Sequence, residues 1–203
     1  MINISNNLTR IGQNELFNMS KFVVTENFKH HTNEILPKTY GRDVATIYMD
    51  EKNNLANSEI FAVKTTNGEI VGTIRVLKWD YINPLPIQKI FGINPLLCVK
   101  DDLVNEIWHI GRFAIKKGVS DINLLKKLMV AAIKPICKHE NNIAFVECDA
   151  KLLRVMTLMG IKTKVIGKSI NYLGSETIPV TLSYNGLIDF YNRNKYLIEP
   201  VLN

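Results

Sequence analysis

Residues 106 to 118, EIWHIGRFAIKKG, carry ionisable side chains within a stretch whose apolar residues predict a buried strand. Glu106, His109 and Arg112 fall inside this stretch, and a pair of lysines follows it. A charged group in a protein interior is costly unless an opposite charge or a hydrogen bond compensates it. The sequence therefore predicts either a structural ion pair on this strand or a functional site beside it.

The region before this strand combines helical and extended patterns. Apolar residues near helical spacing predict helical pieces within the first 40 residues. Strands are expected at residues 45–49 and 59–66, and Asn67-Gly68 between two apolar runs is a strong hairpin signal. An antiparallel meander is therefore expected, followed at residues 80–97 by a proline-containing surface excursion or lid.

The region after the strand alternates helical and extended patterns. A helix is expected to begin at an N-cap of Ser120 or Asp121 and to end near Lys134, because Pro135 cannot continue it. The later expected elements are a strand at 142–150, a helix at 151–160, strands at 163–173 and 177–184, and a helix at 186–197. No internal repeat or change in composition divides the chain, so a single domain over residues 1–203 is expected.

Composition places the chain among folded globular proteins. Hydrophobic residues make up 46% and charged residues 22% of the sequence, which excludes a disordered chain. No apolar run approaches the roughly 18 residues of a membrane-spanning helix, and the polar N-terminus does not resemble a signal peptide. A cytoplasmic location is expected, with the three cysteines reduced because they form no CxxC pair.

The net charge of +6 favours anionic partners. The basic residues are scattered, which fits a phosphate pocket better than an arm that binds nucleic acid. The sequence lacks helix-turn-helix, zinc-ligand and aromatic-basic patterns, which argues against a nucleic-acid adaptor and against a metal site. It also lacks G-x-G-x-x-G and G-x-x-x-x-G-K-S/T, which disfavours dinucleotide and nucleotide-triphosphate enzymes.

The expected order of elements resembles the GNAT N-acyltransferase superfamily. Gly72 and Arg75 match a Gly-x-x-Arg strand, and Arg112 and Phe113 match the end of a Glu-x-x-Arg-Phe strand. Both strands resemble those of acyl-homoserine-lactone autoinducer synthases and of N-acyl amino acid synthases. The sequence differs from these enzymes where His109 stands at the position of the glutamate.

The resemblance implies an α/β fold in which helices flank a central, mixed, mostly antiparallel sheet. It implies that strand 106–115 separates from strand 143–149, with Gly111 at a bulge, and that an acyl thioester lies in the gap. Acyl-CoA or an acyl-phosphopantetheine on a carrier protein is the expected co-substrate, with no metal. The residues expected to bind this donor are Phe113, Ala114, Ile115, Lys116, Lys117 and Gly118.

Acyl transfer to an amine requires a proton acceptor and a group that stabilises the developing oxyanion. The catalytic candidates are His109, Arg112, Glu106 and Glu147. The substrate-binding candidates are Asp50, Arg75 and Trp108. Met156 occupies the position of a tyrosine that donates a proton in many GNAT enzymes. The resemblance therefore implies either that the thiolate leaves without a proton donor, as in the autoinducer synthases, or that Tyr172 or Tyr184 donates the proton.

Each candidate also has a purely structural interpretation. Arg112 can pair with Glu106 or Asp50 in a semi-buried ion pair, and His109 can be a hydrogen-bonded core histidine. Lys116 and Lys117 can be ordinary exposed lysines.

The expected function is transfer of an acyl group from an acyl thioester to the amine of a small molecule such as an amino acid. A non-catalytic sensor of acyl thioesters with the same fold is an alternative, and a basic nucleic-acid adaptor is a weaker one.

Overall fold

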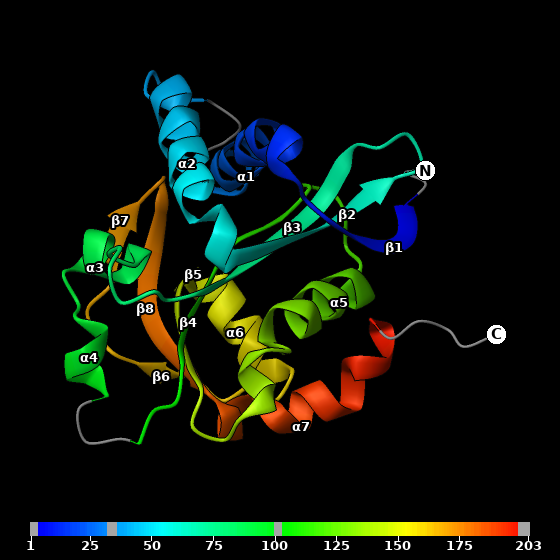
Figure 1. Cartoon of the computed structure of the whole chain (residues 1–203). Coiled ribbons are helices and arrows are strands. Elements are labelled where there is room, and N and C mark those ends of the chain that lie inside the picture. Colours follow the sequence, from blue (N-terminus) through cyan, green and yellow to red (C-terminus); the bar gives the residue numbers. More distant parts are fainter. Residues whose placement is uncertain (1–3, 32–35, 100–102, 199–203) are drawn as a thin grey trace.

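The computed structural model describes residues 4–31, 36–99 and 103–198, and its centre is an eight-stranded mixed sheet (Figure 1). The strands follow the spatial order β1-β2-β3-β4-β5-β8-β6, and β7 pairs with β8. Their bounds are β1 Ile4–Arg10, β2 Ser58–Thr65, β3 Ile70–Lys78, β4 Ile107–Ile115, β5 Ile143–Asp149, β6 Lys164–Val165, β7 Ile170–Tyr172 and β8 Ser175–Ser183. The β4–β5 pair is parallel and the other described pairs are antiparallel, which confirms the expected sheet type.

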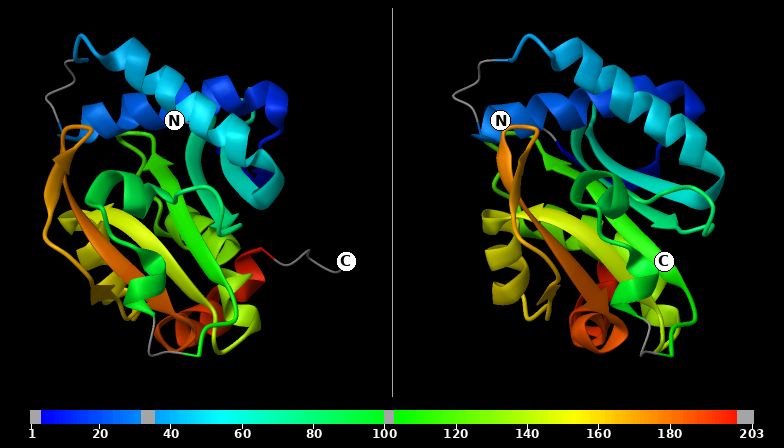
Figure 2. Two further views of the ribbon diagram at one scale, coloured as in Figure 1. Left: turned by 60° about the vertical axis from the view of Figure 1, so that its left-hand side comes forward. Right: turned by 90° about the vertical axis from the view of Figure 1, so that its left-hand side faces the viewer.

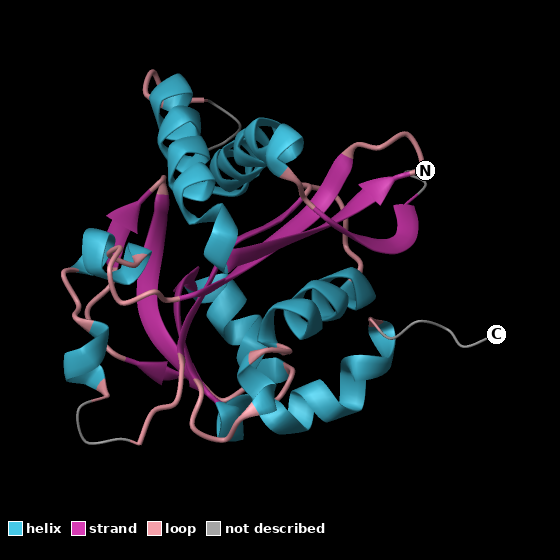
Figure 3. Cartoon of the chain, in the orientation of Figure 1, coloured by secondary structure: helices cyan, strands magenta, loops and turns pink. Residues whose placement is uncertain are grey.

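Helices cover both faces of this sheet (Figure 3). The longer helices are α1 Leu16–His31, α2 Tyr40–Asn54, α5 Ile122–Ile133, α6 Ala150–Leu158 and α7 Tyr184–Asn194. The short helices are η1 Gln13–Glu15, η2 Leu55–Asn57, α3 Pro86–Phe91, α4 Pro95–Cys98, η3 Ile136–Lys138 and η4 Lys195–Leu197. None of the helices in the described ranges is long and apolar enough to cross a membrane.

Two hydrophobic clusters on opposite faces hold the sheet to its helices. Successive strand residues point to opposite faces, so Ile60 packs with Leu16 and Met19 of α1, whereas Val63 packs with Leu128 of α5. All five side chains are at most 2% exposed. Burial of each such side chain contributes about 1.5–3 kcal/mol, which makes these two clusters a main source of stability.

Several expected elements are confirmed. Gly68 takes the left-handed conformation, with φ +85°, in the turn that joins β2 to β3. Asp121 caps α5 by accepting hydrogen bonds from the backbone N–H groups of Asn123 and Leu124, and α5 ends at Ile133 shortly before Pro135. The expected strands at 59–66 and 142–150 correspond to β2 and β5.

The strand expected at residues 45–49 is wrong, because this segment lies within α2. Val44, Ile47 and Glu51 are the buried residues of α2, and their spacing of three and four residues is helical. The β-branched residues in ATIYM favoured a strand locally, but packing of this helical face against α1 determines the outcome.

Three further differences concern segments with weak local signals. The polar segment ISNNLTR forms β1 by pairing with β2, although no strand was expected there. The single strand expected at 163–173 is divided into β6 and β7. The excursion at 80–97 contains α3 and α4, and each of these helices begins at a proline, which suits the first helical position.

The β7–β8 hairpin rises beside the two N-terminal helices (Figure 2). Its turn includes Leu173, with φ 47°, and Gly174, with φ 81°. Leu173 packs against a buried cluster that includes Val24 and Phe28 of α1 and Ile47 of α2. This contact attaches the turn of the hairpin to α1 and α2.

Candidate active site

The strands β4 and β5 separate in the middle of the sheet. Their paired residues run from Ile107 and Ile143 to Ile110 and Val146. Both strands continue beyond this point, where β4 remains paired with β3 and β5 with β8. A cavity of about 780 Å³ opens at the separation, between α1, the beginnings of α5 and α6, and the β7–β8 hairpin.

A bulge in β4 lies next to the cavity. Thr73 and Arg75 of β3 are opposite Ala114 and Gly111, so β4 holds one extra residue over this interval. The residue in the left-handed conformation is Arg112, with φ 55°, rather than Gly111. The Thr73 hydroxyl donates to the Arg112 carbonyl at 2.8 Å and fixes the bulge. Such strain in a non-glycine residue costs of order 1–3 kcal/mol and is concentrated at functional sites.

Gly111 is required for a different reason from the one expected. A Cβ atom at this position would lie 2.8 Å from Cε1 of His109 and 3.5 Å from Nη2 of Arg75. The absence of a side chain at Gly111 therefore lets the imidazole and the guanidinium lie against the backbone of β4.

Glu51 joins the two arginines of the site. It is fully buried, and its Oε1 accepts hydrogen bonds from Nη1 of Arg75 and Nε of Arg112, each at 2.7 Å. Burial by itself raises the pKa of Glu51, but Arg75 and Arg112 outweigh it and lower that pKa below its usual value. Glu51 was not expected from the sequence, whereas its expected neighbour Asp50 lies 3.4 Å from Arg112 and 3.1 Å from Lys89.

His109 links this ion cluster to the opposite wall of the cavity. Its Nδ1 lies 2.6 Å from Nη2 of Arg75, and its Nε2 lies 2.8 Å from Oε2 of Glu147. A guanidinium can only donate, so Nδ1 accepts from Arg75 and Nε2 carries the proton donated to Glu147. Burial lowers the pKa of His109, and Arg75 acts in the same direction, whereas Glu147 opposes it. The imidazole is therefore neutral, and its one lone pair is engaged by Arg75.

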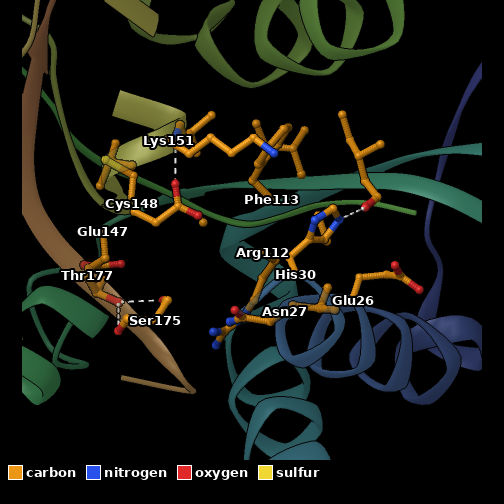
Figure 4. Close-up of a pocket in the computed structure, with 18 of the residues that line it drawn as sticks. Glu26, Asn27, His30, Arg112, Phe113, Glu147, Cys148, Lys151, Ser175 and Thr177 are labelled. Atoms are coloured by element: carbon orange, nitrogen blue, oxygen red, sulfur yellow. Dashed lines mark hydrogen bonds between the residues drawn. The ribbon is translucent and has the colours of Figure 1, made fainter. Parts of the chain in front are cut away.

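Glu147 brings a carboxylate oxygen to the cavity wall (Figure 4). Its side chain is 9% exposed, and among the described residues its Oε1 has no hydrogen-bond partner. Ser175 and Thr177 of β8 extend the same polar wall and hydrogen-bond to each other at 3.2 Å. A buried acceptor without a protein partner is positioned to bind a donor group of a ligand.

The rest of the cavity is lined by apolar side chains and by residues of α1. Apolar lining comes from Ile74, Leu125, Met129, Val155, Met156 and Leu182. Figure 4 shows Glu26, Asn27 and His30 of α1 across the cavity from Glu147. The cavity thus combines a polar wall with space for an apolar group.

The structure brings together only some of the expected site residues. His109, Arg112, Glu147, Phe113, Ala114 and Ile115 line the cavity, and Arg75 and Asp50 contact Arg112 or its partners. Glu106 pairs with Lys78, and neither Glu106 nor Trp108 is among the residues that line the cavity. Lys116, Lys117 and Gly118 lie in the loop beside it without lining it.

Of the two tyrosines considered as proton donors, only Tyr172 lies at the cavity, and Cys148 lies there too. Tyr172 lines the cavity, and burial is the main cause that raises its pKa. Tyr184 begins α7 and is not among the lining residues. Cys148 lines the cavity, but burial raises the pKa of its thiol to about 12, so it is not a thiolate nucleophile at neutral pH.

The neutral state of His109 predicts a loss of stability in acid. Its pKa is lowered in the folded protein, so below the ordinary value of about 6.5 the unfolded chain binds more protons at this residue than the folded chain. The free energy of unfolding contributed by this residue is therefore present above about pH 6.5 and is lost as pH falls. Urea denaturation at pH 7 and pH 5 should show a smaller loss for His109→Gln than for the wild type. His139→Gln, at an exposed histidine, should not reduce the loss; equal losses in all three proteins would contradict this prediction.

Comparisons with known proteins identify the fold. No protein-family model matches the chain, and no curated protein matches it. FeeM, an N-acyl amino acid synthase from uncultured soil microbes, has a similar structure, with a TM-score of 0.63, 14% identity, and coverage of 94% of this chain and 97% of FeeM. The acyl-homoserine-lactone synthase LasI gives a TM-score of 0.57 at 16% identity, covering 95% of this chain and 96% of LasI. A GNAT-family acetyltransferase from Staphylococcus aureus Mu50 gives a TM-score of 0.56 at 14% identity, covering 88% of this chain and 98% of that protein. The chain therefore has a GNAT-like fold that resembles the autoinducer synthases and N-acyl amino acid synthases.

Proposed function

We propose that this protein transfers an acyl group from an acyl thioester to the amine of a small molecule such as an amino acid. The observation that carries the proposal is Oε1 of Glu147, a carboxylate oxygen that no described residue pairs with, at the point where β4 and β5 separate. The structural similarity to FeeM and LasI, whose names describe such syntheses, supports it. The donor is acyl-CoA or an acyl-phosphopantetheine on a carrier protein.

The reaction needs the thioester carbonyl and the amine on the same side of β4. We place the carbonyl near the backbone N–H groups of Phe113 and Ala114, which stabilise the developing oxyanion. The amine nitrogen attacks the carbonyl carbon, and Oε1 of Glu147 takes a proton from that nitrogen. As the C–N bond becomes an amide, the C–S bond breaks and the thiolate takes a proton from water or from Tyr172.

His109 and the two arginines position the base in this scheme. Arg75 engages the lone pair of His109, so the imidazole presents its N–H to Glu147 and holds the carboxylate in one orientation. Glu51 pairs with both arginines, and Asp50 supplies a second carboxylate beside Arg112. Of the candidates His109, Glu106 and Glu147, the proposal therefore assigns the role of base to Glu147.

Arg112→Lys should lose activity almost as severely as Arg112→Ala. Arg112 donates through Nε to Glu51 and through Nη2 to Asp50, and a single ammonium group cannot reproduce this planar fork. We expect both variants to lower kcat/KM by at least about tenfold, which corresponds to 1.4 kcal/mol. The measurement is thioester turnover by proteins whose fold is verified by circular dichroism. Recovery of most activity in the lysine variant would contradict a role for the fork.

The proposed function is tested by supplying acyl thioesters of several chain lengths with a panel of amino acids and of amines that lack a carboxylate. Thiol release that depends on the amine, with an equal amount of N-acyl product in the mass spectrum, is the expected result. Intact thioester binding without product from any amine would favour the non-catalytic sensor instead.

A further inference from the structure

The loop between β4 and α5 borders the cavity. Val119, Ser120, Asp121 and Ile122 line the cavity, and α5 begins at Ile122. Backbone N–H groups at the N-terminus of a helix bind anions, because they are free donors at the positive end of the helix dipole. This loop is therefore the part of the cavity wall where a phosphate of the donor would be stabilised.

Two carboxylates of the chain already accept from N–H groups of this loop and of the first turn of α5. Oε2 of Glu26, a buried residue of α1 that also lines the cavity, accepts from the backbone N–H of Lys117 at 2.7 Å. Oδ1 of Asp121 accepts from the backbone N–H groups of Asn123 at 2.8 Å and Leu124 at 3.2 Å. Oε1 of Glu26 also pairs with Nζ of Lys29 at 3.0 Å. An incoming pyrophosphate would therefore have to break both contacts of Glu26 and the cap of Asp121, or lie beside the two carboxylates.

The lysines of the loop are also turned toward partners within the chain. Nζ of Lys116 lies 3.3 Å from Oε2 of Glu69, and Nζ of Lys117 donates to the carbonyl of Lys29 at 3.0 Å. His30 contacts the carbonyl of Ile115 at 2.9 Å, so α1 is attached to the end of β4 at several points. These contacts hold Glu26 against the loop and hold both lysines away from the cavity wall.

We propose that Glu26 and Asp121 are specificity-determining residues that exclude the pyrophosphate of coenzyme A from this loop. The selected donor is a pantetheine thioester that places no pyrophosphate there, and its acyl and pantetheine parts supply the binding energy. This inference rests on the proposed function, which it deepens by defining the donor. It differs from the expectation that Lys116, Lys117 and Gly118 bind the donor.

The test compares equilibrium binding of coenzyme A and of pantetheine, which differ by the phosphate-bearing nucleotide. Wild-type protein should bind coenzyme A no more than about fivefold more tightly than pantetheine, a difference below 1 kcal/mol. The double variant Glu26→Gln with Asp121→Asn keeps an acceptor oxygen at both positions and removes both charges. We expect it to bind coenzyme A about tenfold more tightly than wild type does and to bind pantetheine within about twofold of wild type.

The control is Glu140→Gln together with Asp189→Asn, which removes two charges outside the cavity lining and should leave both affinities unchanged. A wild-type preference for coenzyme A above about fivefold, or a double variant in which the ratio of the two affinities is unaltered, would overturn the inference.

Turnover of acyl-pantetheine is measured in parallel. If the binding affinities behave as expected but no N-acyl product forms, the proposed function alone is overturned. If product forms but the wild type binds coenzyme A much more tightly than pantetheine, only this inference is overturned. Failure to bind either compound would overturn both.

Discussion

Replacing Glu147 by glutamine is expected to lower kcat/KM for acyl transfer by a factor of about 10² to 10⁴, the usual contribution of a positioned general base. Glutamine has the size of glutamate, and its side-chain oxygen can still accept the hydrogen bond from Nε2 of His109. An amide does not accept a proton from the attacking amine at neutral pH, so the chemical step should slow while the fold is kept. The measurement is steady-state turnover with the best amine found in the panel.

The matched control is Glu176→Gln, at an exposed glutamate of β8 that also lines the cavity. It removes the same charge from the same cavity without touching His109, and kcat/KM should change by less than about threefold. A folded Glu147→Gln protein with activity close to the wild type would show that this carboxylate is not the base.

The second large effect is expected in stability, from Glu51→Ala. This change removes the acceptor shared by Arg75 and Arg112 and leaves the fully buried guanidinium of Arg75 without its carboxylate. Loss of one partner of a buried ion pair typically costs about 3–5 kcal/mol, because the remaining charge stays desolvated. We expect the free energy of unfolding, measured by urea denaturation at pH 7, to fall by this amount.

The adjacent residue supplies the control for Glu51. Asp50 is partly exposed and lies 3.4 Å from Arg112, so Asp50→Ala should cost only about 0–1 kcal/mol. Equal losses in the two alanine variants would contradict the central position of Glu51 in the cluster.

The sequence pattern alone did not show that Glu51, rather than Asp50, is the buried carboxylate of the site. The β-branched and aromatic residues of ATIYM predicted a strand, in which the inward-facing positions alternate. Packing on α1 makes the segment helical, and the buried positions become Val44, Ile47 and Glu51. The expected strand at 45–49 therefore gave no reason to bury Glu51, whereas Asp50, which was a candidate, pairs with Arg112 at the partly exposed edge of the cluster.

Features set by local chemistry were predictable from the sequence. Asn67-Gly68 encodes its turn directly, and Asp121 was identified as a possible N-cap of α5. The bulge near Gly111 was also expected, but the sequence did not indicate that Arg112 would adopt the left-handed conformation. Features that depend on distant partners, such as the pairing of ISNNLTR with β2, were not predictable because no local signal encodes them.

The role of His109 also depends on residues that are distant in the sequence. An imidazole near neutral pH is the commonest general base, which made His109 the leading candidate from the sequence. The hydrogen bonds to Arg75 and Glu147 leave it no free lone pair, and they transfer the role of base to Glu147 in the proposal. Neither partner could be assigned to His109 from spacing alone.

The most direct test of this account is kcat/KM of His109→Gln beside that of His109→Ala, measured with one amine. Glutamine offers an oxygen to Arg75 and an N–H to Glu147, so a positioning role predicts that this variant keeps activity within about tenfold of wild type. Alanine makes neither hydrogen bond, so Glu147 is no longer held in place. The kcat/KM of His109→Ala should therefore fall by about 10² or more, which is the lower end of what a general base contributes. If both folded variants are equally inactive while Glu147→Gln remains active, His109 itself takes the proton and the account is wrong.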